Sequence, residues 1–325
     1  MQIKRKSRRL TLAVFLVDRW LPSAANTVRA TTLTGYRGHA LNHIVPRMGD
    51  LPLTRLTPRH LNDFYAELRS NGRVKGTGPL GPVTVRRIHG TLHRALNDAV
   101  KWGLIAANPA SAADPPRLEH PAATMRIWTA SQLRSFLETT EGDDLHPLWV
   151  LLATTGMRRG EVLGLRWGDV DLARAVLAVR QTAVTVEGQI RFSEPKSARS
   201  RRVIALDDFT CRVLGQRLAK QRPESSQLVF SSPDGSPLDP AHVSKTFRLL
   251  VEDSGLPLIR LHDLRHTHAT LALQAGVHPK IVSERLGHST VALTLDVYSH
   301  ALSHLQEEAA TRIGRLVFGS TERVY

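Results

Sequence analysis

The sequence is poor in cysteine and in acidic side chains, and it has no long apolar run. Cys211 is the only cysteine, which excludes an internal disulfide framework and a cysteine-based metal knuckle. No apolar stretch approaches the roughly 20 residues that a membrane-spanning helix needs. The first nine residues are basic, and the segment 10–21 that follows is short and interrupted by Asp18 and Arg19. A signal peptide is therefore not expected, and the cytoplasm is the expected location.

The shortage of acidic residues leaves a large positive charge. The 325 residues include 44 Lys and Arg against 29 Asp and Glu, a formal net charge of +15. Residues 1–120 hold 19 basic and 7 acidic side chains, whereas residues 121–325 hold 25 and 22. A positive field concentrated in one part of the chain favours a polyanion, because binding releases counterions from it. A surface that only maintains solubility would not need so uneven a distribution, so we expect nucleic acid binding.

The first part of the chain is expected to be entirely helical, and a chain of this length accommodates two domains. Apolar residues recur at helical spacing in the segments 10–21, 27–45, 57–71 and 83–102. The third of these opens at Thr57, with Pro58 in the first turn. We expect a DNA-gripping helical bundle over residues 10–107, preceded by a basic stub at residues 1–9. Candidate DNA contacts in the fourth helix are Arg86, Arg87 and Arg94.

Residues 108–124 are rich in Pro, Ala and Asp without periodicity, which is typical of a linker. The remainder, 125–318, mixes elements before a tail at 319–325. The expected helices are 129–139, 143–155, 158–165, 207–221, 239–253, 262–275, 278–286 and 303–317, and the expected strands are 175–184, 189–193 and 201–206.

Four segments of this second part stand out as carriers of chemistry. They are Thr155–Leu163, Glu194–Arg202, Leu261–Thr267 and Leu286–Ser289, the last followed by Tyr298. Arg265 precedes His288 by 23 residues, and His288 precedes Tyr298 by 10. One such segment alone is weak, because Gly-Arg-Glu turns are common. In this order and at this spacing, the four together resemble the tyrosine recombinases, also called phage-type integrases.

The resemblance covers about residues 125–317, and the helical first part is similar to the family's core-binding domain. It implies a mainly α fold with a small β-sheet: an N-terminal helical, SAM-like core-binding bundle and a mixed α+β catalytic domain. It further implies a bacterial or phage-encoded site-specific recombinase that needs no metal ion and no nucleotide cofactor. The catalytic set that the resemblance implies is Arg158, Lys196, His262, Arg265, His288 and Tyr298.

In the implied reaction, Tyr298 attacks a backbone phosphate of double-stranded DNA, forms a 3′-phosphotyrosyl link and frees a 5′-hydroxyl. Two guanidiniums, of Arg158 and Arg265, suit the oxygens of a pentavalent phosphate because each can bind them bidentately. A phenol with a pKa of about 10 is only about one-thousandth ionised at neutral pH. The arginines and His262 can offset or accept its proton. Each residue also has a structural alternative: surface ion pairs for the arginines, and packing on a helix edge for the tyrosine.

Lys196 lies in a turn between two expected strands, and the resemblance makes it the general acid for the departing 5′ oxygen. A solvated lysine is the alternative, since the neighbouring Arg199, Arg201 and Arg202 are equally candidate contacts to the DNA backbone. His288 follows Gly287 at a helix end and can donate a hydrogen bond to the phosphate; a core histidine is its alternative reading.

His262 and Arg265 lie one helical turn apart and share a face. His262, His266 and His268 also permit a metal site, but no Glu follows His262 and no compact set of carboxylates accompanies it. Glu161 is expected to cap or pair near Arg158 rather than to react.

The resemblance implies a homotetramer on two DNA segments, with accessory DNA-bending or directionality proteins as possible partners. The expected helix 303–317 has an apolar stripe at Leu305, Ala309, Ile313 and Leu316, which suits docking on a neighbouring subunit or on its own domain. Many phage integrases carry an additional N-terminal domain for arm-type sites, whereas this bundle begins near residue 10. We therefore expect a minimal recombinase or a truncated start. A catalytically silent DNA-binding protein and a topoisomerase that forms the same linkage are the rival functions.

Overall fold

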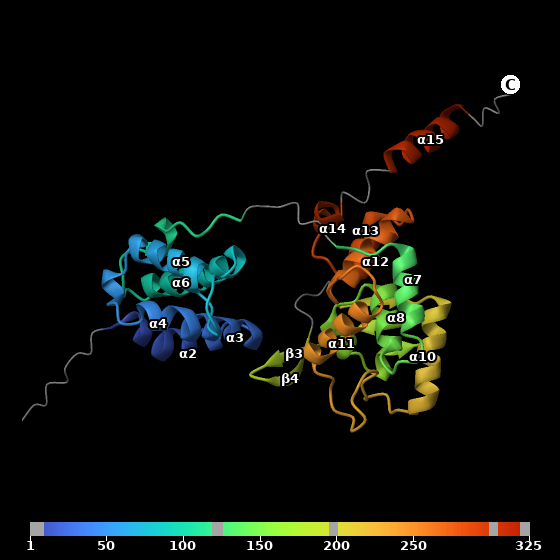
Figure 1. Ribbon diagram of the computed structural model, residues 1–325, viewed down its shortest axis with the longest axis horizontal. Helices are drawn as coiled ribbons and strands as arrows, with labels where there is room; N and C mark the ends of the chain where they lie inside the picture. Colours follow the sequence, from blue (N-terminus) through green and yellow to red (C-terminus); the bar gives the residue numbers. More distant parts are fainter. Residues whose placement is uncertain (1–9, 119–125, 195–200, 299–304, 319–325) are drawn as a thin grey trace, which may run out of the picture. The chain divides into compact units, whose positions relative to one another are not determined.

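The computed structural model describes residues 10–118, 126–194, 201–298 and 305–318 (Figure 1). The chain divides into two compact units, residues 1–123 and 124–325, each of which is described by itself. The fold is mainly helical with small antiparallel sheets, which confirms the expected fold class. None of the described helices combines the length and the apolar character of a membrane-spanning segment.

The first unit is a helical bundle around one apolar core. Its segments are α1 (Leu12–Val14), η1 (Phe15–Trp20), α2 (Leu21–Ala25), α3 (Ala30–His39), η2 (Ala40–Ile44), α4 (Val45–Met48), η3 (Leu53–Arg55), α5 (Pro58–Asn71), α6 (Pro82–Lys101) and η4 (Pro109–Ala112). The expected start of α5 is confirmed, because the Thr57 side chain accepts the backbone N–H of His60 at 3.3 Å. Helix α6 buries one apolar face and leaves the side chains of Arg86, Arg87 and Arg94 exposed.

Two expectations about this unit need revision. The second helical stretch was expected to end at residue 45, but it continues through Pro46 to Met48. The N–H of Val45 reaches back five residues to the carbonyl of Ala40, and this wide turn precedes the proline, which has no N–H to donate. The segment 108–124 is not irregular throughout, because it begins with the 3-10 turn η4, whose Ala110 is buried in the core of the first unit.

The second unit contains short strands between helices. They are α7 (Ala130–Thr139), α8 (His146–Thr155), α9 (Arg159–Leu163), η5 (Trp167–Asp169), β1 (Val170–Asp171), β2 (Val176–Val179), β3 (Thr182–Val186), β4 (Gln189–Ser193), β5 (Arg202–Ala205), α10 (Asp208–Gln221), α11 (Pro240–Asp253), α12 (Asp263–Gln274), α13 (Pro279–Leu286), α14 (Val291–Tyr298) and α15 (Leu305–Phe318).

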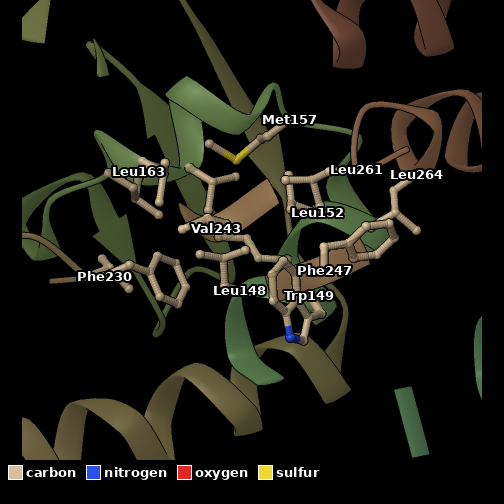
Figure 2. Packing of buried hydrophobic residues seen from close by; sticks show 14 of the residues in the cluster. Leu148, Trp149, Leu152, Met157, Leu163, Phe230, Val243, Phe247, Leu261 and Leu264 are labelled. Atoms are coloured by element: carbon tan, nitrogen blue, oxygen red, sulfur yellow. The ribbon is translucent and has the colours of Figure 1, made fainter. Parts of the chain in front are cut away.

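Helix α8 forms the centre of this unit because it is apolar on all sides. Figure 2 shows its Leu148, Trp149 and Leu152 packed beside Phe247 of α11. The ring centroid of Trp149 lies 5.6 Å from that of Phe247, and Phe136 lies 5.2 Å from the same ring. Fully burying an aromatic or leucine side chain contributes about 1.5–3 kcal/mol to stability. The core therefore fixes the end of α8, from which the chain enters the candidate site.

The strand expected over residues 175–184 is two strands in different sheets. Strand β2 lies between β1 and β5, all antiparallel, whereas β3 pairs only with β4. The chain turns between them at Arg180, which pairs with Asp169, and at Gln181, whose amide donates to the Gly164 carbonyl at 2.8 Å. Alternation of apolar residues continues across this break, so the sequence pattern alone does not reveal it. Helix α14 was not expected at all.

Candidate active site

The first sharp feature of the site is the turn that leaves α8. Gly156 caps the helix with φ of 63°, a left-handed conformation that favours glycine. A Cβ at this position would lie 2.7 Å from side-chain atoms of both His268 and Leu286. The carbonyl of Gly156 accepts a hydrogen bond from Nη1 of Arg265 at 2.7 Å. Gly156 thus brings α8, α12 and α13 together just before Arg158, the N-cap residue of α9.

Glu161 is the acidic centre of a cluster of arginines. Its carboxylate accepts from Nη1 and the backbone N–H of Arg158, both at 2.8 Å. It also accepts from both terminal nitrogens of Arg202, at 3.1 and 2.9 Å. Burial alone would raise the pKa of Glu161, but hydrogen bonding and attraction from Arg202 and Arg158 hold it below its usual value. The expected pairing of Glu161 with Arg158 is confirmed, and a second arginine joins the pair.

The C-terminal end of α13 is held by three arginines. The carbonyl of Leu286 accepts from Nη2 of Arg265 at 2.7 Å, and that of Gly287 accepts from Nη2 of Arg158 at 3.3 Å. The last carbonyls of a helix lack partners within the helix and attract cations. Nε of Arg202 adds a bond to the carbonyl of Arg285 at 2.6 Å. These contacts fix the position of the residue that follows, His288.

The two arginines proposed for the phosphate differ in exposure. Arg265 is only 4% exposed, and burial together with repulsion from Arg158 lowers its pKa to about 9, so it remains charged at neutral pH. The side chain of Arg158 is 39% exposed. One cation of the pair is therefore open to solvent, and the other supplies charge from beneath the surface.

Tyr298 lies at the end of α14 with only 1% of its surface exposed. It packs in a cluster with apolar side chains of α12 and α13. A hydrogen bond of 2.8 Å joins its hydroxyl to Nδ1 of His266, and its ring stacks parallel to that of His288 with centroids 6.4 Å apart. Burial, partly opposed by Arg265, raises the pKa of Tyr298 to about 12. At neutral pH only about one hydroxyl in 10⁵ is then ionised, so attack requires a proton acceptor.

The other two proposed histidines are neutral at neutral pH. Burial, followed by repulsion from His266 and Arg265, lowers the pKa of His262 to about 4. Its ring meets the ring of His266 edge-on, with centroids 5.2 Å apart. Burial and the nearby arginines likewise lower the pKa of His288 to about 4, and its Nδ1 shares a hydrogen bond of 2.8 Å with Oγ1 of Thr294. A neutral imidazole can still donate one N–H to a phosphate oxygen.

Five of the six expected catalytic side chains thus lie in one connected cluster, while Lys196 and also Arg199 lie outside the described residues. Arg201 is exposed and pairs with Glu194. Arg202 is only 6% exposed, and its bonds to Glu161 and α13 favour an internal positioning role over direct contact with DNA.

Sequence reasoning missed His266 as the partner of Tyr298. His266 lies four residues after His262 on α12, a spacing that places both on one face, but this pair had been weighed only as a metal site. Among the described residues, no group of three or more His, Cys, Asp or Glu side chains is placed to hold a metal ion.

Comparison with known proteins identifies the family. The phage integrase family matches residues 127–304, and the phage integrase N-terminal SAM-like domain matches residues 14–69. A tyrosine recombinase XerC-like protein of Caldanaerobacter subterraneus subsp. tengcongensis is 25% identical, across 93% of this chain and 82% of that protein. The ICEBs1 integrase of Bacillus subtilis is 26% identical, across 82% and 72%. The Tn1549 transposon integrase, solved in complex with a circular intermediate DNA, has the same fold, with a TM-score of 0.76 at 22% identity over 94% of this chain and 99% of that one. The chain therefore belongs to the phage integrase family, the tyrosine recombinases.

Proposed function

We propose that this chain is a site-specific DNA recombinase that cleaves and rejoins DNA through a covalent bond to Tyr298. The observation that carries this proposal is the cluster of Tyr298 with two arginines and two neutral histidines. A transferring phosphoryl group is stabilised mainly by preorganised positive charge and hydrogen-bond donors around its oxygens. Arg158, Arg265, His262 and His288 supply such groups beside the hydroxyl.

In the proposed cleavage, the hydroxyl oxygen of Tyr298 forms a bond to phosphorus while the bond from phosphorus to the 5′ oxygen breaks. Lys196 protonates the departing oxygen, a role that the family resemblance supports. The freed 5′-hydroxyl of one duplex then attacks the phosphotyrosine on a partner duplex. Because each step replaces one phosphoester with another, the bond energy is retained and no ATP is consumed.

Burial of Tyr298 adds one requirement to this scheme. A hydroxyl that is sealed among apolar side chains cannot reach a DNA backbone, so α14 must shift before attack. The helix ends at Tyr298, and its N-terminal side follows the arginine-held turn at Gly287 and His288. The arginine cluster can therefore stay in place while α14 moves.

We propose that residues 10–107 act as the core-binding domain, residues 108–124 as the linker and residues 125–318 as the catalytic domain. The exposed arginines of α6 suit the phosphate backbone, as does the positive charge of the first 120 residues. Strand exchange between two sites involves four strands, which supports a homotetramer on two duplexes in the bacterial cytoplasm, and accessory DNA-bending or directionality proteins are possible partners.

Integration and excision of a mobile element is the proposed role, since the similar ICEBs1 and Tn1549 proteins are named as integrases of such elements. A topoisomerase would form the same bond but act on single duplexes. Recombinant products from two separate duplexes distinguish the two functions.

The proposal is tested with nicked duplexes that tile the DNA flanking the gene, incubated with the protein in EDTA. We expect a covalent adduct that survives denaturant and disappears in Tyr298→Phe. Binding without any adduct would instead support the catalytically silent DNA-binding protein.

A further inference from the structure

We propose that His266 accepts the proton of Tyr298 as the tyrosine attacks DNA. This inference rests on the proposed function and adds a catalytic residue to it. Sequence spacing had left the proton to His262 or to the arginines, whereas the geometry points to the next histidine along α12.

The contact is direct. Nδ1 of His266 lies 2.8 Å from the hydroxyl oxygen of Tyr298, within the range at which a general base abstracts a proton. His262 packs edge-on against His266, on its own helix. In this arrangement His266 is in hydrogen-bond contact with the nucleophile, and His262 contacts the base.

The surroundings of His266 keep it able to accept a proton. Partial burial lowers its pKa, Asp263 opposes this shift, and Arg265 and Arg260 reinforce it. His262 and His288 also face it, and each of these rings is itself neutral at neutral pH. A neutral His266 with its proton on Nε2 presents the lone pair of Nδ1 to the phenol.

The step balances without a further reactant. The O–H bond of Tyr298 breaks, its proton moves to Nδ1 of His266, and the phenolate oxygen forms the bond to phosphorus. The bond to the 5′ oxygen breaks at the same centre, and that oxygen receives its proton from the separate general acid. During rejoining, His266 returns the proton to the departing tyrosine oxygen.

A residue that only orients Tyr298 would make the same contact, so the test must separate orientation from proton transfer. His266→Asn keeps a hydrogen-bonding amide near the position of Nδ1 but cannot take up a proton. His266→Ala leaves space that added imidazole can fill. His278→Asn is the matched control, because His278 is exposed and only caps α13, a task that Asn also performs.

The rate of adduct formation is measured on the nicked duplex across a range of pH, with an ordinary 5′ oxygen and with a 5′-bridging sulfur. We expect His266→Asn to slow the reaction about 10²–10⁴-fold and to make it rise with pH where the wild-type rate is level. Sulfur should not restore this variant, because a thiolate leaves without protonation, whereas imidazole should restore His266→Ala.

An Asn variant as fast as the wild type would overturn the inference, as would full recovery on the sulfur substrate. If the wild type itself forms no adduct, the proposed function fails instead. Melting temperature and DNA affinity, measured on each variant, show whether a slow variant is folded.

Discussion

At the scale of single residues, the site depends on one buried carboxylate. Glu161 joins Arg158 to Arg202, and both arginines also bind the end of α13. A buried carboxylate shared by two guanidiniums orients them only while it remains charged. Its direct role is therefore to position Arg158 rather than to contact DNA.

Replacing that carboxylate should affect both stability and cleavage. Glu161→Gln leaves Arg202 buried without a counter-charge, and removing one partner of a buried ion pair destabilises a protein by about 3–5 kcal/mol. We also expect about 10²-fold slower adduct formation, because Arg158 loses its alignment. Glu252→Gln, which alters an exposed pair with Arg248, should change unfolding by less than about 1 kcal/mol. Urea denaturation and adduct rates measure these effects, and equal behaviour of both variants would contradict the account.

Gly156 gives a second prediction at this scale. Gly156→Ala should destabilise the protein by about 2–4 kcal/mol, because left-handed backbone strain adds to overlap with His268 and Leu286. Gly188 has a φ of 79° but open space around a new Cβ, so Gly188→Ala should destabilise by only about 1–2 kcal/mol. Equilibrium unfolding measures the difference. If Gly188→Ala proved the more damaging change, the close packing at Gly156 would not be the constraint that we infer.

At the scale of elements, α6 presents its arginines on the face opposite its buried one. Arg86→Gln and Arg87→Gln should each weaken DNA binding and reduce the slope of log affinity against log salt by about 1, as expected for one lost phosphate contact. Arg174→Gln, an exposed arginine in the turn before β2, serves as the comparison. Fluorescence anisotropy across a salt series measures the slopes, and unchanged slopes in the α6 variants would exclude these contacts.

Most elements could be predicted from sequence because local signals mark them. Thr57 with Pro58, and Thr129 with Gln132, define helix starts that the structure confirms. The break at Arg180 could not be predicted, because it depends on bonds to Asp169 and Gly164 in another element.

The same reasoning applies to the site. The motif order predicted the arginines and Tyr298, since family patterns preserve those residue types. Helix α14 was missed because β-branched residues, Val291 and Thr294, weaken its local helical signal. The contact between His266 and Tyr298 joins residues 32 positions apart, and only the packing of α14 on α12 creates it.

At the scale of the whole molecule, the histidines make stability depend on pH. Burial lowers the pKa of His268 to about 4, and its Nε2 has no partner among the described residues. As pH falls below about 6.5, the unfolded chain binds a proton that the folded chain does not. The contribution of a neutral His268 is thus complete above that pH and declines toward about pH 4.

We therefore expect acid to destabilise the second unit. His268 alone should account for about 2 kcal/mol of lost stability at about pH 5, with His262 and His288 acting in the same direction. The free energy of unfolding, compared at neutral pH and at about pH 5, measures the loss. His268→Met should lose less on acidification than the wild type, and an equal loss would show that His268 does not titrate as inferred.

The charge distribution and the buried nucleophile describe one molecule that grips DNA with one part and reacts with the other. The most direct measurement of that account is peptide mapping, by mass spectrometry, of the adduct formed on a nicked duplex. The account predicts a single modified peptide in which Tyr298 carries the 3′-phosphoryl end of the DNA. A phosphoryl group attached to any other residue, in protein whose Tyr298 is intact, would contradict it.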